Sequence, residues 1–459
     1  MPKPNTYLLG FSTLLVVLGV CLARRAEQKQ FNECQLERLN ALEPDHRVQS
    51  EAGVTESWNA NHPELRCAGV AVVRRTLYTN ALHLPSYSNG AQMHFIVQGR
   101  GVIGVAIPGC AETYDAPQPE DRHQKLHEIK EGDIVAIPVG ISYWTYNNGD
   151  TPLVAITLID TTNEENQLDP NPRRFYLAGN PKEEHPETLQ GKHGKQQQQR
   201  KNMLSGFETR SVEDAFNVDE EIASNLQSQS ARIDQMITVR GGLGIMSRPQ
   251  SQQGQQEERE EKQRQQGEGS GNSLEETLCG LKIHQNIADP SQADFFNPLA
   301  GRISGTSLFD LPILRRLQLS AQHVVLYRRG MYTPHWNVNA NSIIYVTRGR
   351  GGVQVVNWEG RLVFDGELRR GQLLVVPQNF AVAHQAWDEG FDFICFRTHE
   401  LAIITPILGK QSFFEATPAK VLANVYGLRL QQALDIKHSR EEGFLFSPSQ
   451  SQEPLVVKA

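Results

Sequence analysis

A long-range internal repeat most constrains what this chain can fold into. The stretch MHFIVQGRGVIGVAIPG, which begins at Met93, is similar to IIYVTRGRGGVQVVNWEG, which begins at Ile343. Both alternate apolar and polar residues, reach a Gly-Arg-Gly turn and continue into a second strand pattern. EGDIVAIPVG, from Glu131, and RGQLLVVPQN, from Arg370, form a second matching pair. The chain therefore contains two copies of one strand-rich unit.

The spacing of the matched glycines differs between the two blocks. Gly99 and Gly349 are 250 residues apart, whereas Gly132 and Gly371 are 239 apart. The first copy therefore carries eleven additional residues, in the polar stretch after Cys110. Short strands separated by Gly, Pro and Asn turns predict a β-sandwich or barrel for each copy.

GRGVIG, which begins at Gly99, has the spacing of a dinucleotide-binding loop. Such a loop needs a helix after its glycines, and an alternating strand pattern follows here instead. We therefore predict a β-hairpin at this position.

A helical pattern follows each copy. SVEDAFNVDEEIASNL begins at Ser211, and AKVLANVYGLRLQQAL begins at Ala419, which aligns Phe216 with Tyr426. The apolar face of such an exposed helix needs a partner, and we expect another subunit to supply it.

The sequence between the copies is of a different kind. Residues 249–272 contain eight Gln and no aliphatic or aromatic residue, so they cannot offset their ordering entropy. This composition predicts a disordered, protease-accessible linker.

The linker also divides the chain by charge, with a net charge of −9 for residues 24–272 and +1 for residues 273–459. The overall charge of −7 and the lack of a basic stripe argue against a nucleic-acid partner.

The N-terminus has the pattern of a signal peptide spanning residues 1–23. Lys3 precedes an apolar run from Leu8 to Ala23, which is too short to span a bilayer comfortably. We expect cleavage near Ala23, entry into the secretory pathway and no membrane association afterwards. Disulfides are then possible, and five of the six cysteines remain, with a connectivity that the sequence leaves open.

An ordered set of blocks resembles the 11S, or legumin-type, seed globulins of the cupin superfamily over nearly the whole chain after the signal. The blocks are CAGVAVVRRT, PGCAETY, GDIVAIPVG, FYLAGNP, SLEETLC, LPILRRLQLSA, TPHWNVNANSIIYVTRGRG and VFDGELRRGQLLVVPQNF. The resemblance implies an all-β fold with helical extensions: two tandem cupin jelly-roll barrels, each followed by a small helical domain. Residues 24–248 would form an acidic chain with the first barrel. Residues 273–459 would form a basic chain with the second.

The same resemblance implies a seed storage protein that acts as a nutrient reservoir. A trimer would form in the endoplasmic reticulum and travel to protein storage vacuoles. An asparaginyl endopeptidase would then cut Asn272–Ser273, where the family usually has Asn-Gly, and two trimers would stack as a hexamer. IgE of sensitised people is a further expected partner.

The resemblance also assigns the cysteines. It implies an intrachain Cys34–Cys67 bond, a Cys110–Cys279 bond between the acidic and basic chains, and a buried free thiol at Cys395. If Cys34 is paired with Cys67, as the resemblance implies, Cys110 and Cys279 are the only pair that could join the halves, unless Cys395 does so.

Cupins also include metal enzymes, which hold manganese or iron with three His and one Glu at fixed spacings. The corresponding positions of the first copy carry no imidazole or carboxylate, and those of the second keep one imidazole, His335. His384 lies two residues past its ligand position, on the same strand face as His335. We therefore predict no metal, no cofactor and no catalytic residue. The alternatives are a metal-dependent cupin oxidase or decarboxylase and a small-molecule carrier. The first-copy positions are Pro85/Tyr87 or Ser86/Ser88, Gln92, Tyr143 and Asn147, and the second-copy positions are His335, Asn337, Ser342, Val382 and Ala386.

Overall fold

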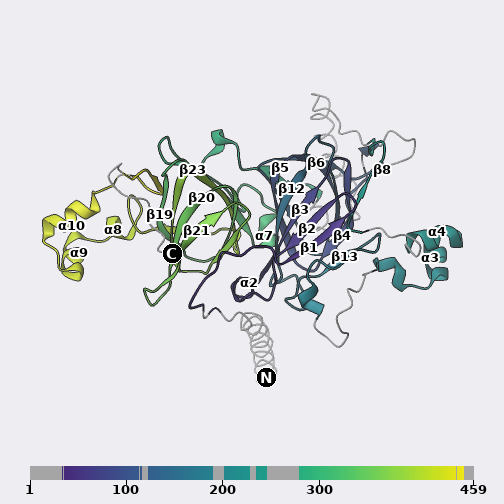
Figure 1. Cartoon of the computed structure of the whole chain (residues 1–459), viewed down its shortest axis with the longest axis horizontal. Coiled ribbons are helices and arrows are strands. Elements are labelled where there is room, and N and C mark those ends of the chain that lie inside the picture. The colour runs from purple at the N-terminus through teal and green to yellow at the C-terminus, as the bar shows by residue number, and fades with distance from the viewer. Residues whose placement is uncertain are drawn as a thin grey trace, which may run out of the picture.

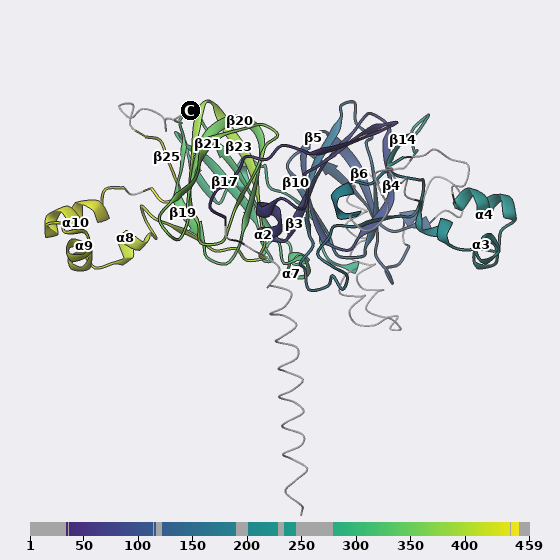
Figure 2. The same cartoon turned by 60° about the horizontal axis from the view of Figure 1, so that its bottom comes forward.

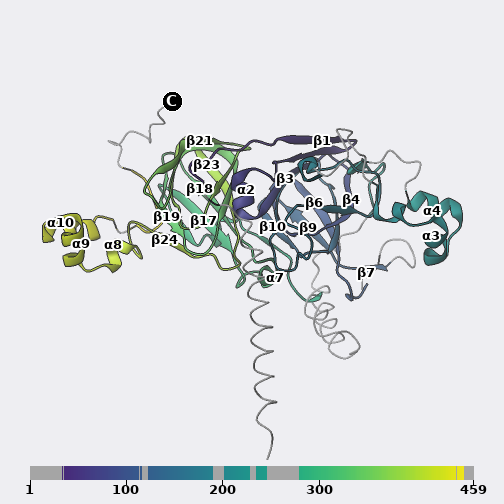
Figure 3. The same cartoon turned by 90° about the horizontal axis from the view of Figure 1, so that it is seen from below.

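The computed structural model describes residues 34, 36–112, 114–115, 122–189, 201–227, 234–244, 279–440 and 442–448. Two β-barrels lie side by side, and a helical module projects from the outer end of each (Figure 1). Views turned by 60° and by 90° show the same arrangement (Figure 2, Figure 3). The prediction of two barrels with helical extensions is confirmed.

The first barrel consists of two antiparallel sheets. One has the order β1 (His46–Ser50), β2 (Gly53–Ser57), β3 (Val70–Leu77), β12 (Leu153–Asp160), β5 (Ala91–Gln98), β10 (Asp133–Ile137) and β15 (His284–Asn286). The other has the order β13 (Arg174–Tyr176), β4 (Ala81–Ser88), β11 (Ser142–Tyr146), β6 (Arg100–Ala106) and β9 (Leu126–Lys130), and β14 (Met236–Thr238) pairs with β4. The short pair β7 (Tyr114–Asp115) and β8 (Arg122–His123) lies in the addition after Cys110.

The second barrel is one ten-stranded sheet dominated by two long, bent strands. These are β20 (Ser342–Val356) and β23 (Ala381–Arg397), which pair with each other along most of their length. The remaining strands are β16 (Phe295–Asn297), β17 (Gly301–Thr306), β18 (Ser320–Leu326), β19 (Met331–Asn337), β21 (Leu362–Arg369), β22 (Leu373–Val376), β24 (Ile404–Pro406) and β25 (Leu445–Phe446).

The hairpin predicted at Gly99 is wrong. β5, before the turn, pairs with β10 and β12, whereas β6, after it, pairs with β9 and β11. The turn therefore carries the chain from one sheet to the other. Gly99 has a φ of 86°, and a Cβ there would lie 2.6 Å from the Pro152 carbonyl oxygen, so glycine is required. The local sequence gives the turn, but long-range pairing decides which sheet the next strand joins.

Each barrel is completed by a segment from the other half of the chain. Residues 36–42, the N-terminal strap, run along the second barrel, where the Leu39 amide donates to the Val363 carbonyl. Leu36 and Leu39 are buried in the second barrel's apolar core. Leu42 exchanges backbone hydrogen bonds of 2.7 and 2.9 Å with Leu373 of β22.

The exchange also runs in the opposite direction. β15, from the second half, adds an edge strand to β10 of the first barrel. The apolar core of the first barrel also includes side chains from the second half. They are Ile283 and Ile287, which flank β15, and Leu314 and Leu317 of α7 (Leu314–Leu317). The two halves are thus interleaved.

Five of the remaining helices form two small modules. Each predicted helical pattern is two helices, because a left-handed residue interrupts it: Asn217 in the first module and Gly427 in the second. Among the described residues, no helix is long and apolar enough to cross a bilayer. The helices are α2 (Pro63–Ala68), α3 (Thr209–Phe216), α4 (Glu220–Leu226), α8 (Phe413–Ala416), α9 (Ala419–Tyr426) and α10 (Leu430–Lys437), with 3-10 turns at Pro186–Leu189, Met203–Gly206 and Pro290–Gln292.

Candidate functional site

In the first barrel, side chains at the cupin metal-ligand positions are hydrogen-bonded to an arginine. Arg174 of β13 donates to the Ser86 hydroxyl at 3.1 Å and to the Tyr143 hydroxyl at 3.0 Å. It also donates to Oε1 of Gln92 at 2.8 Å. A guanidinium is always charged. These positions therefore hold a fixed cation among neutral oxygens.

The other motif positions of the first barrel have structural roles. The Asn147 amide group donates to three backbone carbonyls, those of Leu77, Tyr78 and Thr151, and so closes a turn. Tyr87 stacks on Phe175 with ring centroids 5.0 Å apart. None of these contacts gathers imidazoles or carboxylates around one point.

Glu184 is the carboxylate that faces the buried arginines. Arg75 of β3 donates to both Glu184 oxygens at 2.7 and 2.8 Å, and Arg174 donates to Oε2 at 3.2 Å. The Tyr176 hydroxyl donates to the same carboxylate at 3.0 Å. Burial raises the pKa of Glu184, but Arg75 and Arg174 outweigh it and hold that pKa well below its usual range. Two cations therefore share one anion.

Two histidines of the first barrel lie beside this network. His83 of β4 and His94 of β5 are almost completely buried and flank the Tyr143 ring, with centroids 6.0 and 5.2 Å from it. Burial, reinforced by Arg75 and Arg174, lowers the pKa of each imidazole well below its usual value. The protein interior therefore favours the neutral form of both rings.

In the second barrel, the structure brings together the two histidines that the sequence places on one face. The ring centroids of His335 and His384 are 5.9 Å apart. His335 shares a 2.7 Å hydrogen bond between Nδ1 and the Thr333 carbonyl, and its pKa is lowered to about 3, mainly by burial. Asn337, at the second His position, donates to the Ser342 hydroxyl at 2.8 Å. Two imidazoles therefore lie near each other, but no third His, Cys, Asp or Glu among the described residues completes a metal-ligand group with them.

Neither barrel collects a metal-ligand set in the part of the chain that the structure describes. No group of three or more His, Cys, Asp or Glu residues there has a geometry that could hold a metal ion. The residues at the cupin ligand positions instead bond to one another, to Arg174 or to the backbone.

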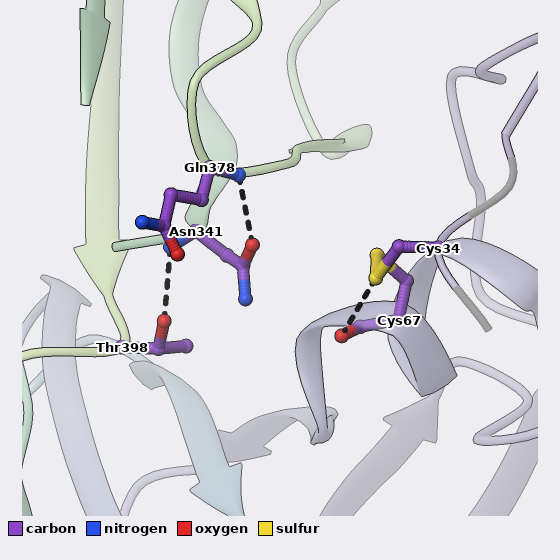
Figure 4. Close-up of a disulfide and its surroundings, with 5 residues drawn as sticks. All are labelled: Cys34, Cys67, Asn341, Gln378 and Thr398. Carbon is purple, nitrogen blue, oxygen red and sulfur yellow. Dashed lines mark hydrogen bonds between the residues drawn. A yellow bond between two sulfur atoms is a disulfide. The ribbon is translucent and has the colours of Figure 1, made fainter. Parts of the chain in front are cut away.

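Two disulfides fix the ends of the exchanged segments. Cys110, after β6, is bonded to Cys279, which precedes β15, with Cα atoms 5.4 Å apart. Cys34 is bonded to Cys67 of α2 with Cα atoms 4.8 Å apart, next to the start of the N-terminal strap. Figure 4 shows this second bond together with side chains of the neighbouring second barrel. Cys395 is buried and unpaired. The expected cleavage sites at Ala23 and Asn272–Ser273, and the linker 249–272, lie outside the described residues.

Sequence reasoning missed the central residues of the first barrel: Arg75, Arg174 and Glu184. One signal was present, because an arginine at an inward position of an apolar strand, as in VAVVRRTL, needs a buried partner. The partner Glu184 lies in a loop after β13, and nothing in its local sequence connects it to β3.

Comparisons with known proteins agree with this architecture. Residues 39–183 and 285–433 match the cupin family. The chain is 50% identical to legumin type B of Vicia faba over 98% of this chain and 100% of that one. Its fold is similar to the coconut allergen cocosin, with a TM-score of 0.79 and 43% identity over 91% of this chain and 100% of that one. It is also similar to procruciferin, the 11S globulin of Brassica napus, with a TM-score of 0.80 and 38% identity over 92% and 99% of the two chains. The chain therefore belongs to the legumin-type 11S seed storage globulins of the cupin superfamily.

Proposed function

We propose that the chain acts as a non-enzymatic nutrient reservoir, a store of nitrogen and carbon deposited in the protein storage vacuoles of seeds. One observation carries the non-enzymatic part of the proposal. In the first barrel, Arg174 engages the cupin ligand positions Ser86, Gln92 and Tyr143, so these side chains serve stability instead of metal binding. The Gln-rich linker 249–272 adds amide nitrogen and an entry point for proteases.

We further propose that an asparaginyl endopeptidase cuts Asn272–Ser273. Cys110 and Cys279 lie on either side of that cut in the sequence. The bond between them would therefore keep the acidic and basic chains covalently joined. The interleaved segments would hold the same two chains together without a covalent bond.

Assembly into a trimer and then a hexamer is the third part of the proposal. The helical modules at the two ends of the protomer expose large apolar side chains, including Phe216 and Ile222 in one and Val425 and Tyr426 in the other. Apolar faces at opposite ends of one protomer suit head-to-tail contacts that close into a ring. IgE of sensitised people is an expected external partner.

A direct test follows the protein through the life of the seed. We expect the chain to accumulate during seed filling, persist in dry seeds and disappear during germination, as measured by quantitative immunoblotting of vacuole fractions. Constant amounts through seedling growth would contradict a reservoir role.

Metal analysis of the purified native protein tests the alternative of a cupin oxidase or decarboxylase, since stoichiometric manganese, iron or copper would favour it. An apolar compound that co-purifies at one per protomer would favour the carrier alternative.

A further inference from the structure

A small, mainly apolar cavity with several polar groups on its wall lies between the two sheets of the first barrel. Its volume is about 30 Å³, enough for one or two water-sized groups. Most of its wall is Leu, Ile and Val side chains. The polar groups on the wall come from both sheets and are Arg75, His83, His94, Tyr143, Thr145 and Thr157.

Several nitrogen atoms on this wall have no hydrogen-bond partner among the described protein atoms. They are Nε of Arg75, both ring nitrogens of His83 and Nε2 of His94. All three side chains are more than nine-tenths buried. Buried polar groups of native proteins nearly always find a partner, so these nitrogens indicate a ligand in the cavity.

Hydrogen-bond donors dominate this set. The Thr157 hydroxyl lies 2.8 Å from Nδ1 of His94, and a hydroxyl that donates there leaves the ring proton on Nε2. His83 is neutral and carries one N–H, and Nε of Arg75 is an obligatory donor. Three of these four nitrogens thus donate and the second ring nitrogen of His83 accepts, so a ligand that satisfies most of them is an acceptor.

The charge balance points the same way. Arg75 and Arg174 are both buried cations, and Glu184 is the one carboxylate among the main electrostatic influences on His83. Among the described residues, one positive charge of this network is thus left without a counter-ion. Burial of an uncompensated charge is costly, and a bound anion would remove the imbalance.

We propose that this cavity binds one small monovalent anion of about the size of chloride, held by Arg75, His83 and His94. The anion neutralises the excess charge of the Arg75–Glu184–Arg174 network and accepts the free N–H groups. The site is independent of the reservoir role.

Bromide is a suitable probe because it resembles chloride and scatters anomalously. Crystals of the full-length protein, grown without halide, would be soaked in bromide from millimolar to molar concentration. We expect an anomalous peak within hydrogen-bonding distance of His83 and His94 at millimolar bromide, and none in Arg75→Met. Arg173→Met, which changes an exposed neighbour of the network, should retain the peak. Absence of the peak, its appearance only at molar bromide, or its persistence in Arg75→Met would overturn the proposal.

A solution measurement covers the case in which Arg75→Met does not crystallise. At constant ionic strength, replacement of chloride by the bulky anion isethionate should lower the melting temperature of the wild-type protein. His83→Leu should abolish that difference, and His83→Gln, which keeps an N–H donor, should preserve part of it. Equal melting temperatures of the wild-type protein in both salts would contradict an anion in the cavity. Nitrate, tested in the same way, reports whether the site accepts planar anions as well as halides.

Discussion

The guanidinium of Arg174 donates a 2.8 Å hydrogen bond to Oε1 of Gln92, the residue that stands at the glutamate position of the cupin metal motif. An acidic metal ligand has thus been replaced by a neutral acceptor, and a protein cation lies beside it. The same arginine bonds to the Tyr143 hydroxyl at the position of a ligand histidine. The frame of the motif remains, but its interactions contribute to stability.

Loss of this arginine should be costly. Arg174→Met removes the buried guanidinium donor of Ser86 and Tyr143, leaves Gln92 Oε1 with only the Tyr143 hydroxyl as a donor, and removes one partner of Glu184. We expect a loss of about 3 kcal/mol in the free energy of unfolding, measured by urea denaturation. Arg173→Met is the matched control, because Arg173 pairs with Asp169 at the surface. It should cost less than about 1 kcal/mol. Equal effects of the two substitutions would mean that the buried network contributes little.

Stability should fall as the pH decreases from about 6.5 towards 4. Burial lowers the pKa of His323 to about 4 and that of His335 to about 3, whereas the unfolded chain protonates near 6.5. Between these pH values the unfolded state binds protons that the native state does not. The contribution of the buried neutral imidazoles to the free energy of unfolding is therefore complete above pH 6.5 and decreases below it. In this pH window each imidazole lowers the free energy of unfolding by on the order of 1 kcal/mol for each unit by which the pH decreases.

Urea titrations at pH 7, 6, 5 and 4 check this dependence. His323→Gln should reduce the slope by about one proton. A stability that stays constant from pH 7 to 4, or a slope unaffected by His323→Gln, would contradict the assignment.

The two halves should remain together without the covalent bond between them. The N-terminal strap, with Leu36 and Leu39, is buried in the second barrel, and β15 with Ile283 and Ile287 is part of the first. We expect Cys110→Ser protein, cleaved in the linker by limited proteolysis, to elute as one species in native gel filtration. It should separate into two chains only in denaturant. Separation under native conditions would show that the disulfide, and not the interleaving, holds the halves.

The exposed face of the second helical module should be needed for assembly. Val425 of α9 is 69% exposed, and Tyr426 beside it is 50% exposed. Val425→Asp should give a folded monomer in analytical ultracentrifugation, because it places a charge in an apolar contact. Asn424→Asp adds the same charge at the next position and should still form trimers. Trimers of normal stability in Val425→Asp would place the contact elsewhere.

The sequence predicts the features that depend on local patterns. The two barrels follow from the repeat, and the eleven-residue addition coincides with β7 and β8. The shared face of His335 and His384 follows from strand periodicity, and their ring centroids are 5.9 Å apart.

Features that depend on pairing between distant segments were not predictable. Gly99 indicates a turn in the sequence, but only the pairing of β6 with β11 shows that the chain changes sheets there. The exchange of segments between the halves has no local signal. The strand around Arg75 indicates that a buried partner is needed, but not that this partner is Glu184, 109 residues away. A buried ion pair needs only a facing position in the fold, and any of the chain's 52 acidic residues could have supplied it.

The most direct test of a processed storage globulin is a gel of the protein purified from mature seeds, run with and without reductant. We expect one large species that reduction splits into a larger acidic chain and a smaller chain whose N-terminal residue is Ser273. A single intact chain in reductant would show that Asn272–Ser273 is not cut in the seed, and two chains that separate without reductant would show that the Cys110–Cys279 bond does not join them. Either result would contradict the proposed processing.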